Sequence, residues 1–536
     1  MIAVSNGWVD AHKETLLPEM FVELTYEVTE PGLQGDASAS SSNGEADFSE
    51  VETIVNGKDK NSERYASLEH GFFGLTGDFS FFDGAPVDPG YVSRQVSRAG
   101  GTFAARTMLT INFSKQHTVP IPGITITWSK TFNEWAQSFR VTALNAGQVV
   151  NQIMVEENTS LVSQVWLDMQ YYDQITIEIQ RWSLPGHRAR CAEVRLGIEK
   201  MYTKNDLLGF DHTQTADLLS ATLPKNAISF RLRNDDNRWN PENPDGVERY
   251  LLEQQEVRLR YGMTVGGDIE WIKGGTFWLS EWSTPSNGIE ASFTARDAIE
   301  FMNGIYTGTR SGTLYAIAQS ALEQADLPPL DDGSTRYVLA DVLKKYSTDL
   351  TADTSEYTIA QILQLVAHAG CCVFHQDRDG IVRIEPMSGS YCGYMIEPHI
   401  SYTHPEYTIG KPLRAVAVSY GEDQTATVVS SGSGEVQTVS NAMLRTESDA
   451  LRVGEWTKSV LEHRKVLSGE FRADVRLDVL DNIIVSSKYA SNVIALTEVA
   501  FSTSGGAFRG KYSGRVTTID LKPADRRSNE FYSGEI

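Results

Sequence analysis

Residues 21–28 of the chain are FVELTYEV, in which apolar and polar side chains alternate almost one by one. Such alternation gives a strand one buried face and one solvated face. The same period recurs at 124–128, 174–179 and 257–261. Turns rich in Gly, Asn and Asp separate these segments, as they do in β-sandwiches and β-barrels. The sequence therefore predicts a mainly β protein.

The length and charge of the chain limit its class. A chain of 536 residues is longer than one hydrophobic core usually serves, so we expect several domains. The formal net charge of −23 repels phosphate backbones and argues against specific nucleic-acid binding. No apolar run reaches the roughly 18 residues that a membrane helix needs, so we expect no membrane span. Residues 1–20 lack a basic leader followed by an apolar stretch, and no secretory signal is expected.

Composition and periodicity divide the chain into segments. Residues 31–62 are small and polar, which predicts a flexible surface loop. Residues 63–200 contain many short strands and suit one β-sandwich. Apolar residues at helical spacing predict three helices, which cover 313–324, the segment from an N-cap at Ser355 to Gly370, and about 448–467.

Two polar motifs are similar to ligand-binding loops but fit turns better. Residues 505–511, GGAFRGK, match the start of a phosphate-binding P-loop. Tyr512 replaces the Ser or Thr that binds magnesium, and both flanks are strand-like, so we expect a hairpin. Residues 235–245 are rich in Asp and Asn, but Trp239 stands where calcium needs an oxygen ligand. Successive turns are expected there.

No catalytic grouping is apparent around the ten histidines. His368 and Cys371 are nearly adjacent at a helix end, whereas catalytic Cys–His pairs usually come from separate elements. Acidic residues are abundant, and nothing selects a glycosidase pair among them. We therefore expect no enzyme, no metal and no cofactor. The cysteines follow no disulfide or zinc spacing and are expected to be small buried apolar residues: Cys191, Cys371, Cys372 and Cys392.

Aromatic residues are concentrated in 63–200. Flat rings stack on the apolar C–H faces of sugars, but large rings also fill sandwich cores. Trp128 and Phe139 lie within alternating strands and are expected in the core. Trp135, in a turn-like segment, is the best placed for exposure. The candidate glycan contacts are Trp135, Trp166, Tyr171 and Trp182.

Several ordered segments together resemble the hub family of bacteriophage tail tips and baseplates. They are 230–241 (FRLRNDDNRWNP), 275–279 (GTFWL), 291–297 (ASFTARD), 369–374 (AGCCVF), 377–384 (DRDGIVRI) and 471–481 (FRADVRLDVLD). The last one departs from the family pattern, because Val475 and Leu480-Asp481 replace a proline and a Gly-Asp pair. The resemblance covers about 1–30 and 205–536. The block at 63–200 lies outside it and looks like an inserted galectin- or carbohydrate-module-like sandwich.

This resemblance implies a multidomain hub of β-barrel-like domains plus a small α+β domain. The expected segments are 1–30 (first strands of a hub barrel), 31–62 (flexible loop), 63–200 (inserted β-sandwich), 201–305 (remainder of the first barrel), 306–400 (small α+β domain) and 401–536 (second hub β-domain with the helix at about 448–467).

The resemblance also implies a structural virion protein without enzymatic activity. A homotrimeric hub of this kind closes or adapts the tail tube and links it to host-recognition parts. Its partners would be the distal tail protein, the tape-measure protein and other tail-tip proteins. Its place would be the tail tip of the virion, after assembly in the bacterial cytoplasm. The alternative is an adhesin that binds a host surface glycan, or a tail enzyme that cleaves glycan or peptidoglycan.

Overall fold

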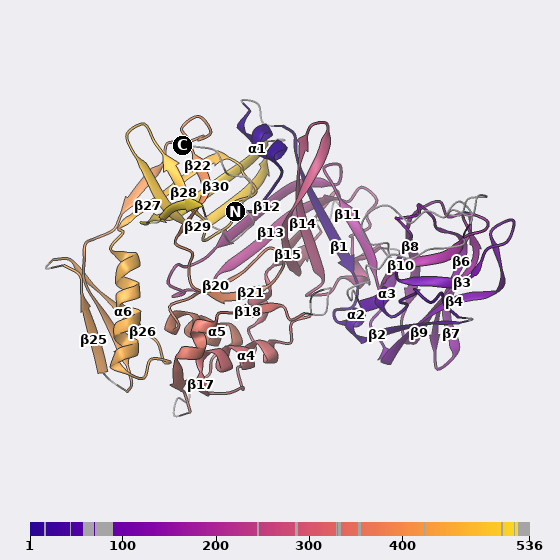
Figure 1. Cartoon of the computed structure of the whole chain (residues 1–536), viewed down its shortest axis with the longest axis horizontal. Helices are drawn as coiled ribbons and strands as arrows, with labels where there is room; N and C mark the ends of the chain where they lie inside the picture. Colours follow the sequence, from indigo (N-terminus) through magenta and orange to yellow (C-terminus); the bar gives the residue numbers. More distant parts are fainter. Residues whose placement is uncertain are drawn as a thin grey trace, which may run out of the picture.

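The computed structural model describes residues 1–14, 18–42, 44–56, 69, 89–243, 246–284, 288–328, 330, 334–351, 355–422, 424–431, 433–504, 507–518 and 520–523. Strands dominate, which confirms the predicted mainly β class. The molecule is elongated in Figure 1, with a β-sandwich at one end, a large sheet in the middle and helices below that sheet. No helix in the described ranges is long and apolar enough to span a membrane.

The largest sheet has 14 strands drawn from both halves of the chain. Its main path runs β11-β1-β14-β15-β16-β13-β12-β29-β28-β22-β31, and β30, β27 and β23 branch from β29. The strands are β1 (Met20–Val28), β11 (Ile198–Tyr202), β12 (Leu207–Thr215), β13 (Lys225–Arg233), β14 (Glu256–Val265), β15 (Asp268–Ser283), β16 (Glu290–Arg296), β22 (Ser390–Ile396), β23 (Glu406–Ile409), β27 (Lys465–Arg472), β28 (Asn482–Ser486), β29 (Ser491–Ser504), β30 (Ala507–Val516) and β31 (Asp520–Pro523).

This 14-stranded sheet joins the two β-modules expected at 201–305 and 401–536, and it is called the hub sheet only after that expectation. Strand β12 pairs with β13 on one side and with β29 on the other, from Phe210↔Thr503 to Thr215↔Glu498. One hydrophobic core contains buried residues of both modules, including Phe230 and Phe501. The two modules therefore share a sheet and a core, because the dry faces of their alternating strands all turn toward the same interior.

The sandwich consists of two facing sheets around one core. Trp128 and Phe139 are fully buried in it, as predicted, with ring centroids 5.1 Å apart. One sheet has the order β2 (Ala37–Ser42), β4 (Thr102–His117), β9 (Tyr172–Trp182), β6 (Ala136–Asn145) and β7 (Gln148–Val155). The other has the order β3 (Tyr91–Val96), β10 (Arg188–Arg195), β5 (Ile121–Trp128) and β8 (Val162–Met169).

The segment 31–62, expected to be a flexible loop, contributes to the sandwich instead. It contains α2 (Leu33–Asp36), strand β2 and α3 (Thr53–Asn56), while 43 and 57–62 lie outside the described residues. Ala37 and Ala39 of β2 are buried, and their Ser neighbours face outward. This alternation uses only small residues, so composition concealed it. The sandwich therefore begins earlier than residue 63, and it ends before β11 returns to the hub sheet.

Helices α4 (Leu314–Ala325) and α5 (Ile359–Ala369) and short strands form the predicted α+β unit. Thr358, and not Ser355, is the N-cap of α5, because Thr358 and Gln361 make a reciprocal capping box. The other elements here are β17 (Ser311–Thr313), β18 (Tyr337–Leu339), β19 (Ser347–Asp349), β20 (Val373–Gln376) and β21 (Val382–Glu385). Further helical elements are helix α1 (Asn6–Lys13) and the 3-10 turns η1 (Glu248–Tyr250), η2 (Ala298–Phe301) and η3 (Asp341–Lys345).

A second helical unit lies inside the segment expected to be the second hub domain. Helix α6 (Glu447–Leu461) covers a sheet of order β25 (Gln424–Val429), β24 (Leu413–Tyr420) and β26 (Glu435–Ser440). This unit shares its hydrophobic core with α4 and α5. The predicted helix over 448–467 ends at Leu461, because Leu467 and Phe471 are buried as residues of strand β27.

Candidate functional site

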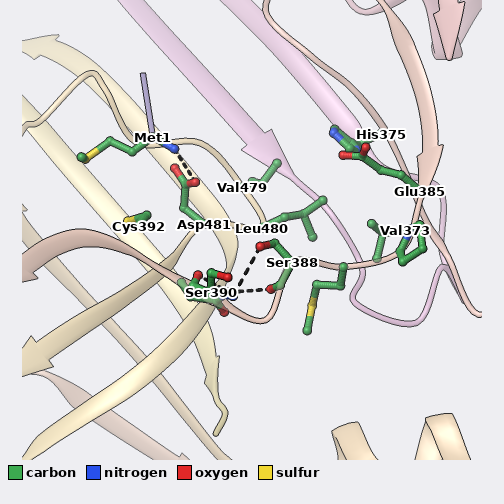
Figure 2. Close-up of a pocket in the computed structure, with 13 residues that line it drawn as sticks. Met1, Val373, His375, Glu385, Ser388, Ser390, Cys392, Val479, Leu480 and Asp481 are labelled. Atoms are coloured by element: carbon green, nitrogen blue, oxygen red, sulfur yellow. Dashed lines mark hydrogen bonds and ion pairs between the residues drawn. The ribbon is translucent and has the colours of Figure 1, made fainter. Parts of the chain in front are cut away.

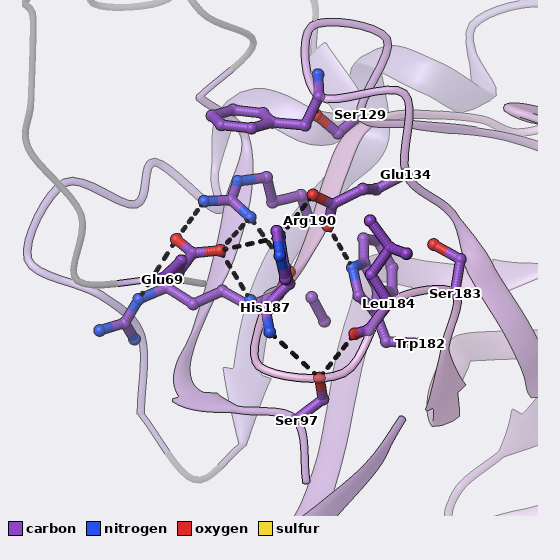
Figure 3. A network of polar contacts seen from close by, with 12 residues as sticks. Glu69, Ser97, Ser129, Glu134, Trp182, Ser183, Leu184, His187 and Arg190 are labelled. Carbon is purple, nitrogen blue, oxygen red and sulfur yellow. Dashed lines mark hydrogen bonds and ion pairs between the residues drawn. The ribbon is translucent and has the colours of Figure 1, made fainter. Parts of the chain in front are cut away.

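Buried charges gather at one end of the sandwich, where its loops meet (Figure 3). The carboxylate of Glu69 forms an ion pair with the guanidinium of Arg190, with 2.7 Å between Glu69 Oε2 and Arg190 Nη1. Both side chains are almost completely buried. The guanidinium carbon of Arg190 also lies 4.1 Å from the ring centroid of Phe132. Two charges this deeply buried need one another, since each would lose hydration without compensation.

Glu134 is the second buried carboxylate of this cluster. It accepts hydrogen bonds from His187 Nδ1 at 2.7 Å and from Trp182 Nε1 at 2.6 Å. Burial raises the pKa of Glu134, and the two donors oppose that shift. Ser97 donates to the carbonyl of Leu184 at 2.8 Å. The cluster joins loops that come from different strands, and its polar atoms bind each other, which is the arrangement of a structural network.

The four candidate glycan contacts do not form one platform. Trp182 is only 1% exposed and packs in the core, so its proposed surface role is wrong. Trp135 is half-buried, and its ring nitrogen donates to Asn158 O at 2.8 Å. Trp166 and Tyr171 are 41% and 53% exposed. Trp182 was not recognisable as buried because it is the last residue of β9, where alternation ends.

The ring of Trp166 lies beside the loop that connects β13 with η1. The guanidinium of Arg238 lies 5.9 Å from the Trp166 ring. Nearby, Tyr250 donates to Asp168 at 3.0 Å, and Arg249 forms an ion pair with Asp168 at 3.4 Å. Trp166 therefore borders a polar contact between the sandwich and the 3-10 turn η1.

A second polar contact joins these units beside Glu27. In the sandwich, Arg195 Nη1 lies 3.6 Å from Glu27 Oε2, and Arg195 Nε lies 3.3 Å from Glu199 Oε2. Arg258 Nη2 also lies 3.6 Å from Glu199 Oε2. Burial raises the pKa of Glu27 to about 7, with Arg195 and Arg258 opposing the shift and Glu256 and Glu199 adding to it. The junction therefore contains a carboxyl group that titrates near neutral pH.

A small cavity lies where the first residue meets the hub sheet (Figure 2). Its volume is about 80 Å³, enough for a few water molecules. The amino group of Met1 lies 2.5 Å from Asp481, and Asn482 donates to the carbonyl of Ser388 at 2.7 Å. Burial raises the pKa of the Cys392 thiol to about 12, so this thiol stays protonated at neutral pH and is a poor nucleophile.

The two polar motifs that are similar to ligand-binding loops, 505–511 and 235–245, lie partly within the described residues. Lys511 lies in strand β30 beside Glu470, while Gly505 and Gly506 lie outside the described residues. Trp239 of the Asp/Asn-rich segment is buried, and Asp245 lies outside the described residues. Within the parts of the chain that are described, no three His, Cys, Asp or Glu residues are grouped so as to bind a metal ion.

His368 and Cys371 have neighbours that suit packing better than catalysis. His368 Nδ1 accepts from Asn441 Nδ2 at 3.0 Å, and burial lowers the pKa of His368 to about 4. Burial raises the pKa of Cys371, although Arg452 lies 3.4 Å from its sulfur. A neutral imidazole beside a protonated thiol is the reverse of an activated Cys–His pair. The cysteines are free, and all except half-buried Cys371 are buried.

These features define a class, a mainly β protein built of several units. The units are a sandwich of two facing sheets, the 14-stranded hub sheet, and small helical units. Neither a protein-family model nor a curated protein sequence matches the chain. Among solved structures it is similar to the 43 kDa tail protein of prophage MuSo2 from Shewanella oneidensis, at 12% identity over 59% of this chain and 94% of that one, with a TM-score of 0.41. It is also similar to the tail protein from Neisseria meningitidis MC58, at 12% identity over 60% and 94%, with a TM-score of 0.39.

A third similar structure matches a smaller part of the chain. It is the family 32 carbohydrate-binding module of NanJ from C. perfringens, solved with galactose, at 17% identity over 33% of this chain and 99% of that one, with a TM-score of 0.20. These neighbours are of the classes that the sequence resemblance named, a tail protein and a carbohydrate module.

Replacing Trp182 by alanine should destabilise the sandwich by about 3–5 kcal/mol, because it removes a buried ring and the donor to Glu134. Replacing exposed Trp166 by alanine should change stability by less than about 1 kcal/mol. Calorimetric scans of the two full-length variants would measure this. Equal transitions for both would contradict the core position of Trp182.

Replacing Glu27 by glutamine should make stability less dependent on pH. The pKa of Glu27 in the folded protein, about 7, lies above the ordinary value of 4.5 for a glutamate. The folded protein thus binds more protons than the unfolded chain between these values, and the stability linked to Glu27 falls as pH rises through this window. The melting temperature of Glu27→Gln, measured relative to that of the wild type, should therefore rise between pH 5 and pH 8. A constant difference would show that Glu27 does not titrate there.

Proposed function

We propose that the chain is a structural component of a bacteriophage tail tip or baseplate, and that it acts as the homotrimeric central hub. The proposal starts from the sequence resemblance at 1–30 and 205–536. The observation that supports it best is the pairing of β12 with β29, which merges two β-modules into one sheet with one core. A subunit that contains two joined β-modules suits a ring whose copies must match the higher symmetry of a tube.

Three such chains would present six β-modules around one axis. In this proposal they close or adapt the end of the tail tube and connect it to host-recognition parts. Their partners are the distal tail protein, the tape-measure protein and other tip proteins. The protein then resides in the virion, after assembly in the host cytoplasm, and its work is contact rather than catalysis. Subunit interfaces would provide the binding energy.

An exposed apolar group on the hub supports contact between copies. Tyr407 and Ile409 of β23 are 41% and 60% exposed, and Tyr402 and Tyr489 are 53% and 87% exposed. Asn492 donates to the Tyr407 hydroxyl at 3.2 Å, which places β23 beside the β28–β29 turn. Exposed aromatic and aliphatic side chains on a strand edge are typical of protein interfaces.

The purified full-length chain should have three times the subunit mass of 59.4 kDa, and electron microscopy should show a three-fold ring. Replacing Ile409 by glutamate should weaken this trimer by placing a charge in the apolar group. Ile269→Glu, at a 43% exposed site of β15, is the matched control and should leave the mass unchanged. A stable monomer at assembly concentrations, or a monomer that turns over a substrate, would refute the hub.

A second candidate function is binding of a host surface glycan by the sandwich. Only the exposure of Trp166 and Tyr171 favours it. On a glycan array, Tyr171→Ala should lose any signal that the wild type gives, whereas Tyr489→Ala, at an exposed tyrosine of the hub, should keep it. A signal unaffected by Tyr171→Ala would refute these contacts, and an array without any signal would remove the glycan from the list of partners.

A further inference from the structure

A groove of about 420 Å³ separates the hub sheet from the helical units. Asp217 and Arg515 line its hub side. His368 of α5, Thr457 of α6 and the strand β26 line the opposite side. The volume falls in the range of roughly 300–1,000 Å³ that is usual for ligand sites. The groove is distinct from the cavity at Met1 and from the charged cluster of the sandwich.

Strand β26 turns an open edge toward this groove. In the described residues β26 pairs only with β24, in parallel. The amide of Glu435 donates to Pro412 O at 2.8 Å, so the main chain of Glu435 points toward β24. Because strand residues alternate, Gln437 and Val439 also point toward β24. The N–H and C=O groups of Val436, Thr438 and Ser440 therefore point the other way, and Gln437–Asn441 border the groove.

The outward N–H and C=O groups of Val436, Thr438 and Ser440 make few hydrogen bonds within the described chain. Their amides have no backbone partner among the described residues, and Thr438 O accepts one long bond of 3.3 Å from the side chain of Gln437. Four of the last five β26 residues, Val436 to Ser440, are exposed. An open strand edge of this kind is a template for one more strand.

The hub side of the groove carries a cationic side chain, that of Arg515. Arg515 is half-buried and donates to His463 O at 3.0 Å. No carboxylate of the described residues lies within ion-pairing distance of Arg515. Burial lowers the pKa of Arg515, and the charge of Asp217 opposes this shift. The Asp217 carboxylate accepts its hydrogen bonds from the amides of Leu219, Ala221 and Thr222 at 2.9–3.1 Å. Thr457 adds a buried hydroxyl without a hydrogen-bond partner.

We propose that this groove binds an extended peptide segment of a partner protein, which adds to β26 as a fourth strand and turns an acidic side chain toward Arg515. Main-chain bonds to Thr438 and Ser440 would give affinity, and Arg515 would give specificity. An acidic peptide is the occupant that the charge of the groove favours, because Arg515 lines the same groove as Gln437–Asn441 and bonds only to a carbonyl, His463 O, among the described residues. This inference does not depend on a role in a tail.

The test uses the full-length protein and a yeast-display library of random linear peptides. We expect the protein to enrich peptides that contain an acidic residue. Thr438→Pro removes one outward amide and should lower their affinity about tenfold or more, as should Arg515→Gln. Hydrogen exchange at Thr438 and Ser440 should slow when such a peptide binds.

Thr427→Pro is the matched control, at the opposite edge of the same three-stranded sheet. The amide of Ser430 donates to Arg414 O, so the main chain of Thr427 points away from β24, and its side chain is exposed. This variant should bind the peptides like the wild type, which separates edge blocking from unfolding. The proposal is overturned if no peptide is enriched, if Thr438→Pro and Thr427→Pro bind alike, or if Thr438→Pro changes the oligomeric state, since the occupant would then be a second copy.

Discussion

The hub sheet depends on the ladder between β12 and β29. This ladder pairs six residues of each strand and makes one sheet from segments almost 300 positions apart. His212 of this ladder is buried; its Nε2 donates to Asn226 at 2.9 Å and its Nδ1 accepts from Tyr261 at 2.7 Å. Burial lowers the pKa of His212 to about 4, so the imidazole is neutral and its two bonds fix one arrangement of the strands.

The N-terminal segment reinforces the same join. The amide of Ile2 donates to Arg476 O at 2.8 Å, and His12 Nε2 donates to Ala473 O at 3.1 Å. Asp474, fully buried, pairs with Arg476, and this partner lowers the pKa of Asp474 against the effect of burial. Removing either partner would leave an uncompensated buried charge. The first strand of one module is thereby attached to the second module.

Much of this fold follows from local pattern, and the remainder depends on distant partners. Alternation predicted the strands β1 and β14 of the hub sheet and the buried pair Trp128 and Phe139. It could not predict that Ala37 and Ala39 are buried, because small residues acquire a dry face only from the opposing sheet. The ion pair of Glu69 with Arg190 was equally hidden, since 121 positions separate the partners. The resemblance suggested the hub modules but not that they share one core.

The hub sheet can accept large insertions because each one leaves and re-enters through paired strands. The sandwich lies between Val28 and Ile198, which are opposite one another in the β1–β11 ladder. The unit that contains β26 and α6 lies between Ile409 and Lys465, which are opposite one another in the β23–β27 ladder. Each insertion thus replaces a hairpin loop and leaves the strand order of the hub intact. The second insertion then packs on α4 and α5 rather than on the hub, and the groove beside β26 is the space that this packing leaves open.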